Sequence, residues 1–238
     1  MSLQTPQPWL VFDTGDDFST GHSGFGDLAD RWNITGNPAD FKSGSTSIPF
    51  CSGFAIITPD TITAKIDTTG ATCSQTSGIY GTTSTPANSA AFITNCVANT
   101  AGTLSTTPGG LTTNNLPRAG CFASGNSVVT PPAMGTYGNM GRNIFRDSGF
   151  KNVDFSVFKD FKFRERFGAE FRVEFFNLFN HPIIANPFGS SNTSFLGPDP
   201  SNPGKFGCGC STPDVAAGNP LIGSGSSRVM QLGLKLSF

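Results

Sequence analysis

The stretch of sequence that decides the fold is Arg-Val-Met-Gln-Leu-Gly-Leu-Lys-Leu-Ser-Phe, residues 228–238. Apolar side chains occupy every second position, and most residues between them are small, polar or charged. Strict alternation of this kind predicts a β-strand with one apolar face. A tilted strand crosses a lipid bilayer with about 9–11 residues, so this run is long enough to do so. Its alternating apolar positions are Met230, Leu232, Leu234, Leu236 and Phe238.

Two further alternating runs lie upstream, over residues 153–161 and 169–175. The polar segment Arg164-Glu165-Arg166 lies between them, and two alternating runs joined by a short break predict a β-hairpin. Phe158 is an exception to the alternation in the first run. The apolar positions are Val153, Phe155, Val157 and Phe161 in the first run, and Phe171, Val173 and Phe175 in the second.

Alternation alone does not say which face of these strands meets water. A soluble sheet buries its apolar face, whereas a membrane barrel turns that face to lipid and its charges to the lumen. The hairpin fits either arrangement. The apolar run at 228–238 favours the membrane arrangement, because the terminal residues of soluble domains usually fray.

The composition argues against an ordinary α/β enzyme. Charged residues make up 13% of the 238 residues, against roughly 25% in typical soluble domains. The net charge of −1 disfavours a nucleic-acid groove. Residues 43–141 carry only four charges, whereas residues 142–188 carry fourteen charges and twelve of the 23 Phe residues. The chain therefore divides into a charge-poor segment rich in Ser, Thr, Gly and Asn and a charged, Phe-rich segment.

The sequence shows neither a signal peptide nor a membrane-spanning helix. The first eight residues contain no basic segment followed by an apolar one. The longest continuous apolar runs are only a few residues, such as 54–57, whereas a spanning helix needs about 20.

Four segments of the sequence form distinctive motifs: Gly138-Asn-Met-Gly-Arg-Asn-Ile-Phe-Arg146, Gly149-Phe-Lys-Asn-Val-Asp-Phe-Ser-Val-Phe-Lys159, Phe171-Arg-Val-Glu-Phe-Phe-Asn-Leu-Phe-Asn-His-Pro182 and the ending Lys235-Leu-Ser-Phe238. Together they resemble the carboxyl-terminal end of a TonB-dependent outer-membrane receptor, of the Oar-like type that carries an N-terminal carboxypeptidase-regulatory-like domain. A weaker likeness covers Asp30-Arg-Trp-Asn-Ile-Thr-Gly-Asn-Pro38.

The resemblance implies an all-β fold: the last few antiparallel strands of a transmembrane β-barrel, which is incomplete in this chain, with long irregular extracellular loops. Such receptors have about 22 strands, and nothing here resembles their plug or their TonB-contacting segment. We expect one partial barrel over 1–238, with Phe238 and the turn at 164–166 at its periplasmic end. The strands are expected near 3–12, 152–163, 167–179 and 228–238, and the loops over 13–150 and 180–227.

Six cysteines lie in the expected loops, and the oxidising periplasm makes disulfides plausible. Pairing among the first four is expected, but the sequence does not give the connectivity. Cys208-Gly-Cys210 is expected to be too tight for an easy mutual disulfide. That pair also lacks nearby His or carboxylate partners for a metal. The first four cysteines are Cys51, Cys73, Cys96 and Cys121.

Other candidate sites have simpler structural explanations. His22 and His181 lack the sequence context of a catalytic triad. Asp13, Asp16 and Asp17 around Gly15 could chelate calcium, but the spacing is not that of an EF-hand, and an Asp/Gly turn explains it. Gly138, Gly141 and Arg142 lack the strand and helix of a phosphate loop. We therefore expect no catalytic residue, metal or cofactor.

The function expected from the resemblance is nutrient uptake, with a siderophore, saccharide or peptide as the ligand. Asp154, Glu170, Arg172 and Glu174 are expected to face the lumen, either pairing across strands or contacting the plug or a solute. The terminal run with Phe238 resembles the signal that the barrel-assembly machinery reads. Other expected partners are outer-membrane lipid and, only through the missing plug, TonB. The alternative is a secreted or surface-exposed, disulfide-bonded β-rich adhesin, and a soluble β-sandwich hydrolase fits least.

Overall fold

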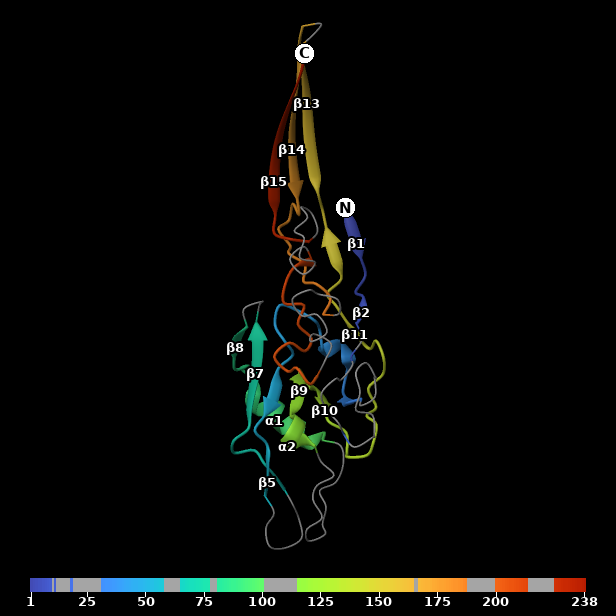
Figure 1. The fold of residues 1–238 in the computed structure, drawn as a ribbon, viewed down its shortest axis with the longest axis vertical. Coiled ribbons are helices and arrows are strands. Elements are labelled where there is room, and N and C mark those ends of the chain that lie inside the picture. Colours follow the sequence, from blue (N-terminus) through green and yellow to red (C-terminus); the bar gives the residue numbers. More distant parts are fainter. Residues whose placement is uncertain are drawn as a thin grey trace.

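The computed structural model describes residues 1–9, 11, 18, 31–57, 65–77, 81–100, 115–164, 167–187, 200–213 and 225–238. A long three-stranded sheet projects from a globular region (Figure 1). The carboxyl terminus lies at the free end of this projecting sheet, and the amino terminus lies beside its base (Figure 1). None of the helices in the described residues is long and apolar enough to cross a membrane.

The projecting sheet consists of β13 (Phe155–Arg164), β14 (Phe167–Phe176) and β15 (Val229–Ser237), in that order and all antiparallel. The strands expected near 152–163, 167–179 and 228–238 are therefore present, with slightly different ends. The short break at 165–166 joins β13 to β14 at the free end, so the hairpin forms where the sequence predicts it.

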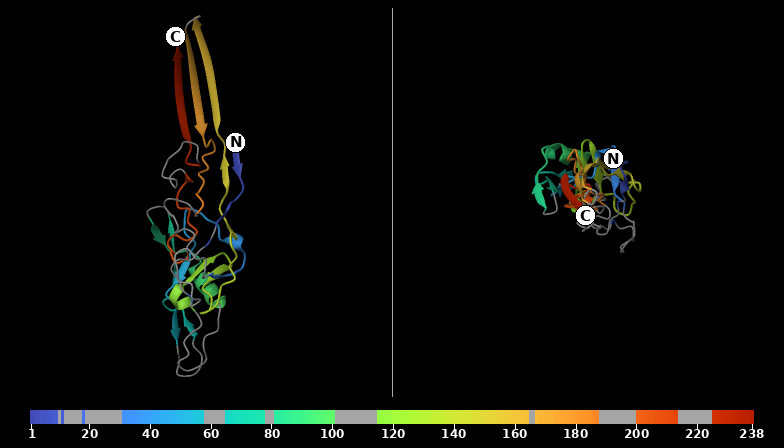
Figure 2. Two further views of the ribbon diagram at one scale, coloured as in Figure 1. Left: turned by 45° about the vertical axis from the view of Figure 1, so that its right-hand side comes forward. Right: turned by 90° about the horizontal axis from the view of Figure 1, so that it is seen from above.

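The expected strand near 3–12 appears as two short strands, and residues 10 and 12 lie outside the described part. β1 (Ser2–Gln4) pairs with β12 (Phe150–Asn152), and β2 (Pro8–Trp9) pairs with β11 (Phe145–Arg146). Only two residues separate β12 from β13. β1 lies beside β12, on the side of β12 that faces away from β14 (Figures 1 and 2).

The globular region contains an antiparallel six-stranded sheet where the sequence predicted irregular loop. Its order is β3 (Asn33–Thr35), β10 (Ser127–Thr130), β9 (Cys121–Ser124), β4 (Phe50–Ser52), β7 (Thr72–Ser77) and β8 (Thr82–Ser84). Ser124 and Ser127 are register partners around a Gly125-Asn126 turn, in which Gly125 has φ of +56°. The described residues of the segment 13–150 are thus more regularly folded than the expected loop.

Helices and a hairpin complete this region. α1 (Ser89–Ala98) packs on the six-stranded sheet through Phe92 and Cys96, which are four residues apart and therefore share a helix face. The remaining elements are a 3-10 turn, η1 (Pro38–Asp40), the short helix α2 (Leu116–Ala119), and a hairpin of β5 (Ala55–Ile57) and β6 (Lys65–Asp67).

An aromatic core joins parts of the chain that are far apart in sequence. Trp9 lies 4.9 Å from Phe145, Trp32 lies 5.5 Å from Phe122, and Phe122 lies 4.5 Å from Phe206, measured between ring centroids. All five side chains are almost completely buried. Because Phe206 belongs to the segment expected as the loop 180–227, both expected loops share one hydrophobic core.

Two of the resembling motifs meet in this region. The backbone N–H of Ile34 donates to Oδ1 of Asn139 at 2.7 Å, and the backbone N–H of Asn139 donates to Oδ1 of Asn33 at 3.0 Å. Gly138 must be glycine for a steric reason, since a Cβ there would overlap the carbonyl oxygen of Arg31. The motif at 30–38 is therefore the docking partner of the motif beginning at 138.

Candidate functional site

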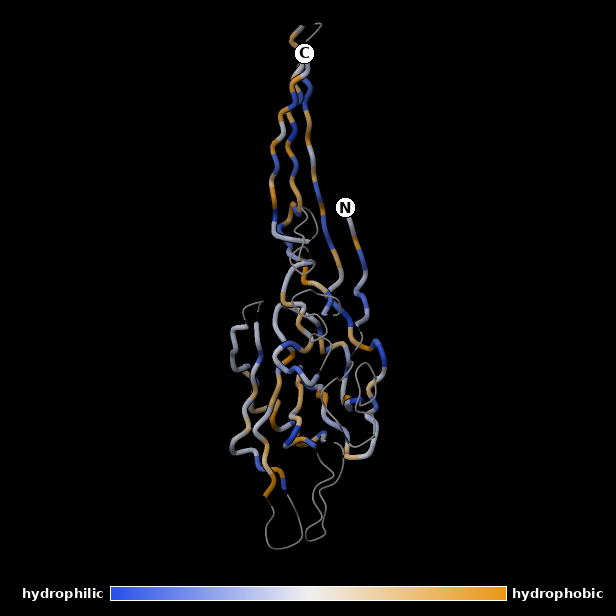
Figure 3. Tube along the Cα trace, viewed as in Figure 1, coloured by the Kyte–Doolittle hydropathy of each residue, from blue (hydrophilic) through white to orange (hydrophobic). Residues whose placement is uncertain are grey.

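The most distinctive surface of the molecule is one face of the projecting sheet. The strand register aligns apolar residues in rows across the three strands, such as Val157, Val173 and Leu232. Most of this apolar face is exposed, with Leu232 at 60% and Leu234 at 66% of full exposure. Figure 3 shows the alternation of hydrophobic and hydrophilic residues along these strands. We define the apolar face as Phe155, Val157, Phe161, Phe171, Val173, Phe175, Met230, Leu232, Leu234 and Leu236.

The length of these strands fits the thickness of a membrane. β13 and β14 each contain ten residues, which correspond to about 33 Å at 3.3 Å per residue. Tilted by about 45°, such a strand covers a height of about 23 Å, close to the apolar band of about 25 Å in outer-membrane barrels. Exposure of such a large apolar surface to water is unfavourable, and soluble monomers rarely show it.

The opposite face of the sheet carries its charges. Arg172 and Glu174 form an ion pair at 2.6 Å along β14. Arg172 therefore pairs along its own strand and not across strands, because its register partners are Phe158 on β13 and Gly233 on β15. Glu170 lies between Asp160 on β13 and Lys235 on β15, so the lysine offsets the repulsion of two facing carboxylates.

One strand departs from the alternation at two adjacent positions. Phe158 lies on the charged face of β13, and Lys159 lies on the apolar face, in the row of Phe171 and Leu234. β14 and β15 each keep one continuous apolar face over this length. The departure is therefore confined to β13, which is an edge strand of this sheet.

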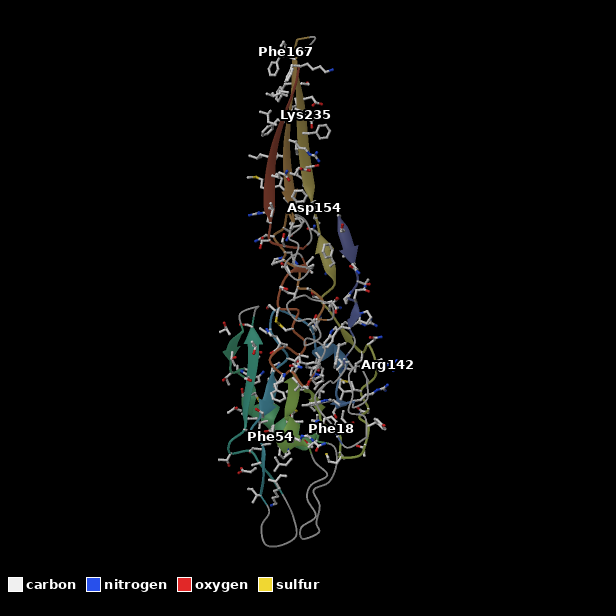
Figure 4. All side chains as sticks on the ribbon, in the orientation of Figure 1. Phe18, Phe54, Arg142, Asp154, Phe167 and Lys235 are labelled. Carbon is white, nitrogen blue, oxygen red and sulfur yellow. A yellow bond between two sulfur atoms is a disulfide. The ribbon has the colours of Figure 1, made fainter. Side chains whose placement is uncertain are left out.

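Aromatic residues gather at the free end of the projecting sheet. Figure 4 places Phe167 and Lys235 near this end and Asp154 at the other end of the sheet. Phe238 is 95% exposed and Phe163 is 68% exposed. The rings of Phe161 and Phe163 stack with their centroids 6.4 Å apart. The residues of the expected assembly signal thus form one exposed stripe on β15 that leads to Phe238.

The base of the sheet is held by a set of side chains that we call the rim: Asp154, Asn177 and Asn180. Asp154 lies just before β13, and its carboxylate accepts hydrogen bonds from Nδ2 of Asn152 and the backbone N–H of Asn177, both at 3.0 Å. The sequence analysis grouped Asp154 with the charges expected to face the lumen. In the structure, its carboxylate is hydrogen-bonded within the base of the sheet, to Asn152 and Asn177.

Asn177 and Asn180 connect the end of β14 to the start of β15. Nδ2 of Asn177 donates to the carbonyl of Ser226 at 2.6 Å, and Oδ1 accepts from the backbone N–H of His181 at 3.0 Å. Oδ1 of Asn180 accepts from the backbone N–H of Arg228 at 3.0 Å. Both asparagines have positive φ, near +50°, which asparagine tolerates better than most residues. His181 thus lies in a turn, and the sequence analysis missed the role of the asparagines beside it.

Replacing Asn177 with alanine should lower the free energy of unfolding of the chain by about 1–3 kcal/mol, because two side-chain hydrogen bonds are lost at a buried position. Urea titration of the chain in detergent measures this change. Asn177→Gly relieves the positive φ and should remain destabilised, whereas Asn88→Ala removes an exposed amide that makes no capping bond and should have little effect. Equal stability of the wild-type protein and both Asn177 variants would show that the hydrogen bonds of Asn177 in the rim do not stabilise the fold.

All six cysteines form disulfides: Cys51–Cys73, Cys96–Cys121 and Cys208–Cys210. Cys51 is the register partner of Cys73 on β7 and of Cys121 on β9, so three cysteines lie in one row across adjacent strands. Cys96 on α1 lies above the sheet and pairs with Cys121. These two disulfides fix the centre of the six-stranded sheet and attach the helix to it.

The third disulfide corrects an expectation from the sequence. Cys208–Gly–Cys210 was expected to be too tight, but the backbone turns sharply, with Gly207 at φ +73° and Cys210 at φ +57°. The Cα atoms of the two cysteines are 4.9 Å apart, inside the usual range of roughly 4.4–6.8 Å. The carbonyl of Gly44 accepts from the N–H groups of Gly209 and Cys210 and holds this turn against the globular region.

The described part of the chain offers no group of side chains for a metal centre. No cluster of three or more His, Cys, Asp or Glu side chains that could hold a metal ion occurs among those residues. Asp13, Asp16, Asp17 and His22 lie outside them.

One exposed carboxylate has a shifted pKa. The hydroxyl and the backbone N–H of Thr69 donate to Asp67 and lower the pKa of its carboxyl. The small stabilisation that these bonds give to the turn after β6 is present at neutral pH, and it is lost as the pH falls through that lowered value.

Comparison with known proteins identifies one family. Residues 43–216, which are 174 of the 238 residues, match the family model described as an outer membrane beta barrel domain. The matched range includes β4 through β14 and therefore covers the six-stranded sheet except β3, together with two strands of the projecting sheet. No curated protein and no solved structure matches the chain.

Proposed function

The chain belongs to the family of outer membrane beta barrel domains, and from this premise we propose that it is the carboxyl-terminal barrel segment of a TonB-dependent nutrient receptor. Its location is the bacterial outer membrane. The observation that carries the proposal is the exposed apolar face of β13–β15, which is continuous on β14 and β15 and is interrupted on β13 by Lys159. That face would meet lipid, and the charged face would line the lumen.

Further strands would be needed to close the barrel. Within the described residues, β13 and β15 each pair with β14 alone, so each has a free edge. A free edge cannot face lipid, because its backbone groups would lack hydrogen-bond partners. β1 already lies alongside β12, next to the free edge of β13. We propose that another strand of the receptor continues along this edge. Lys159 could extend its ammonium toward the membrane surface there.

The two ends of the projecting sheet suggest its orientation. The free end has only a two-residue break between strands and the exposed Phe238, whereas the other end continues into the large globular region. Outer-membrane barrels have short periplasmic turns and long extracellular loops. We therefore place the free end in the periplasm and the globular region outside the cell.

This orientation assigns the partners. Outer-membrane lipid would contact the apolar face, and the barrel-assembly machinery would bind the stripe that ends at Phe238. TonB would act on the plug of the receptor and not on these strands. The nutrient would meet the globular region first, and the role of this segment would be binding and barrel closure without catalysis.

Fractionation and surface proteolysis test this proposal together. An antibody against residues 228–238 should detect the protein in the outer-membrane fraction, and protease added to intact cells should cut the globular region while leaving the 228–238 epitope protected. We expect the membrane band to be much larger than 24.9 kDa. Recovery of the epitope in the soluble fraction would contradict the proposal.

A second candidate is a surface-exposed β-rich adhesin, which the folded state of the globular region favours. This region has its own buried aromatic core and three disulfides. A deletion strain distinguishes the two functions: loss of growth on a scarce nutrient supports the receptor, and loss of attachment with normal growth supports the adhesin.

A further inference from the structure

A cleft of about 560 Å³ lies in the globular region, beside η1 and β11. Three segments that are distant in sequence form it: Pro6, residues 37–39 with 41–42, and residues 144 and 146–148. Small-molecule sites usually measure about 300–1,000 Å³. In the orientation proposed above, this cleft opens outside the cell.

The lining of the cleft includes fixed apolar groups. Phe41 is almost completely buried, and its ring packs edge-on against Phe145 of the aromatic core at 5.4 Å between centroids. Ile144 and Pro38 add further apolar surface. Because Phe41 belongs to the core, this part of the cleft exists before any ligand arrives.

Two cations from different segments of the chain line the cleft. Lys42 follows η1, and Arg146 ends β11; both line the cleft, and both residues are exposed. In the part of the chain that the structure describes, neither forms an ion pair. Two unpaired cations beside an apolar surface would attract an anion.

The nearby carboxylates are held by other groups. Asp147 also lines the cleft, but its two oxygens accept from the backbone N–H groups of Gln7 and Gly149 and from Nδ2 of Asn186, at 2.7–2.9 Å. Asp40 accepts from the hydroxyl of Ser127 at 2.5 Å, on the β10 side of η1. The formal charge of the cleft is therefore +1, with both cations available.

We propose that this cleft binds a small carboxylate ligand that has a flat apolar portion. Lys42 and Arg146 bind the carboxylate, and the apolar portion lies against Ile144 and Pro38. The inference rests on the proposed function, in which such a molecule is, or is part of, the nutrient that the receptor recognises at its outer surface. The sequence alone did not select a class of ligand for the receptor, and the lining of this cleft selects one.

Calorimetric titration of the full chain in detergent micelles with 2-naphthoate tests the inference, with heats corrected against protein-free micelles. We expect saturable binding that weakens at high salt, and no saturable binding of the uncharged analogue 2-naphthamide. Lys42→Met and Arg146→Met should each weaken binding about tenfold, as expected for loss of one charge-assisted contact. Arg142→Met removes an exposed arginine outside the cleft and should leave the affinity unchanged.

Absence of saturable naphthoate binding, equal binding of the amide, or unchanged affinity in both cleft variants would overturn the inference. Near-ultraviolet circular dichroism and disulfide mapping show whether each variant keeps its fold, and Lys42→Gln and Arg146→Gln provide gentler replacements. Failure here is distinguishable from failure of the proposed function, because outer-membrane fractionation does not depend on the cleft.

Discussion

Leu232→Arg should prevent stable insertion of the protein into the outer membrane. Leu232 lies in the middle of β15, in a row with Val173 and Val157 that contains no polar side chain. An arginine on the lipid face near the membrane centre costs about 2–4 kcal/mol in outer-membrane barrels. We expect the folded variant to disappear from the outer-membrane fraction and periplasmic degradation products to appear. Immunoblotting of fractionated cells measures both.

Gln231→Arg is the matched control, since it places the same side chain one residue away on the charged face. Gln231 is the register partner of Glu174, so an arginine there gains a nearby carboxylate. This variant should assemble like the wild-type protein. If both variants assembled equally well, or both failed, the assignment of the two faces would be wrong.

Removing the disulfide between Cys96 and Cys121 should destabilise the globular region by about 3–4 kcal/mol. The two residues are 25 apart in sequence, and cross-linking a loop of this length restricts the unfolded chain by about that amount. The bond also attaches α1 to the six-stranded sheet. The expected result for Cys96→Ala with Cys121→Ala is a much lower urea midpoint, followed by the fluorescence of the buried Trp9 and Trp32.

The disulfide between Cys208 and Cys210 is the control for this prediction. Its partners are only two residues apart, so its removal should cost about 1–2 kcal/mol on the same argument. The double variants should therefore differ clearly in stability. A larger loss from Cys208→Ala with Cys210→Ala than from the Cys96 and Cys121 pair would show that chain restriction is not the main contribution of these bonds.

The projecting sheet could be predicted from the sequence because its signal is local. Apolar and polar side chains alternate with period two over 153–161, 169–175 and 228–238. The short break at 164–166 predicts that the first two runs form a hairpin. The family match covers β13 and β14 and supports the outer-membrane location of the chain. In contrast, the assembly role of the stripe ending at Phe238 stays a prediction.

The globular region could not be predicted because its determinants are non-local. β7 and β8 are rich in Thr and Ser, so no apolar alternation marks them, and the register partners of β3 and β10 are 93 to 97 residues apart in sequence. The aromatic core likewise draws Trp9, Phe145 and Phe206 from separate segments. The turn that brings Cys208 and Cys210 together needs positive φ at a non-glycine residue, which spacing alone does not reveal.

Lipid and water accessibility along β15 tests the central claim most directly. All six cysteines are disulfide-bonded, so an added cysteine provides a single free thiol for a nitroxide label. With the protein in its outer membrane, labels at Leu234→Cys and Lys235→Cys should respond in opposite ways. The label at 234 should be relaxed by oxygen dissolved in lipid, and the label at 235 by a water-soluble nickel chelate. Equal access of the nickel chelate to both positions would contradict the claim that the apolar face of the projecting sheet faces lipid.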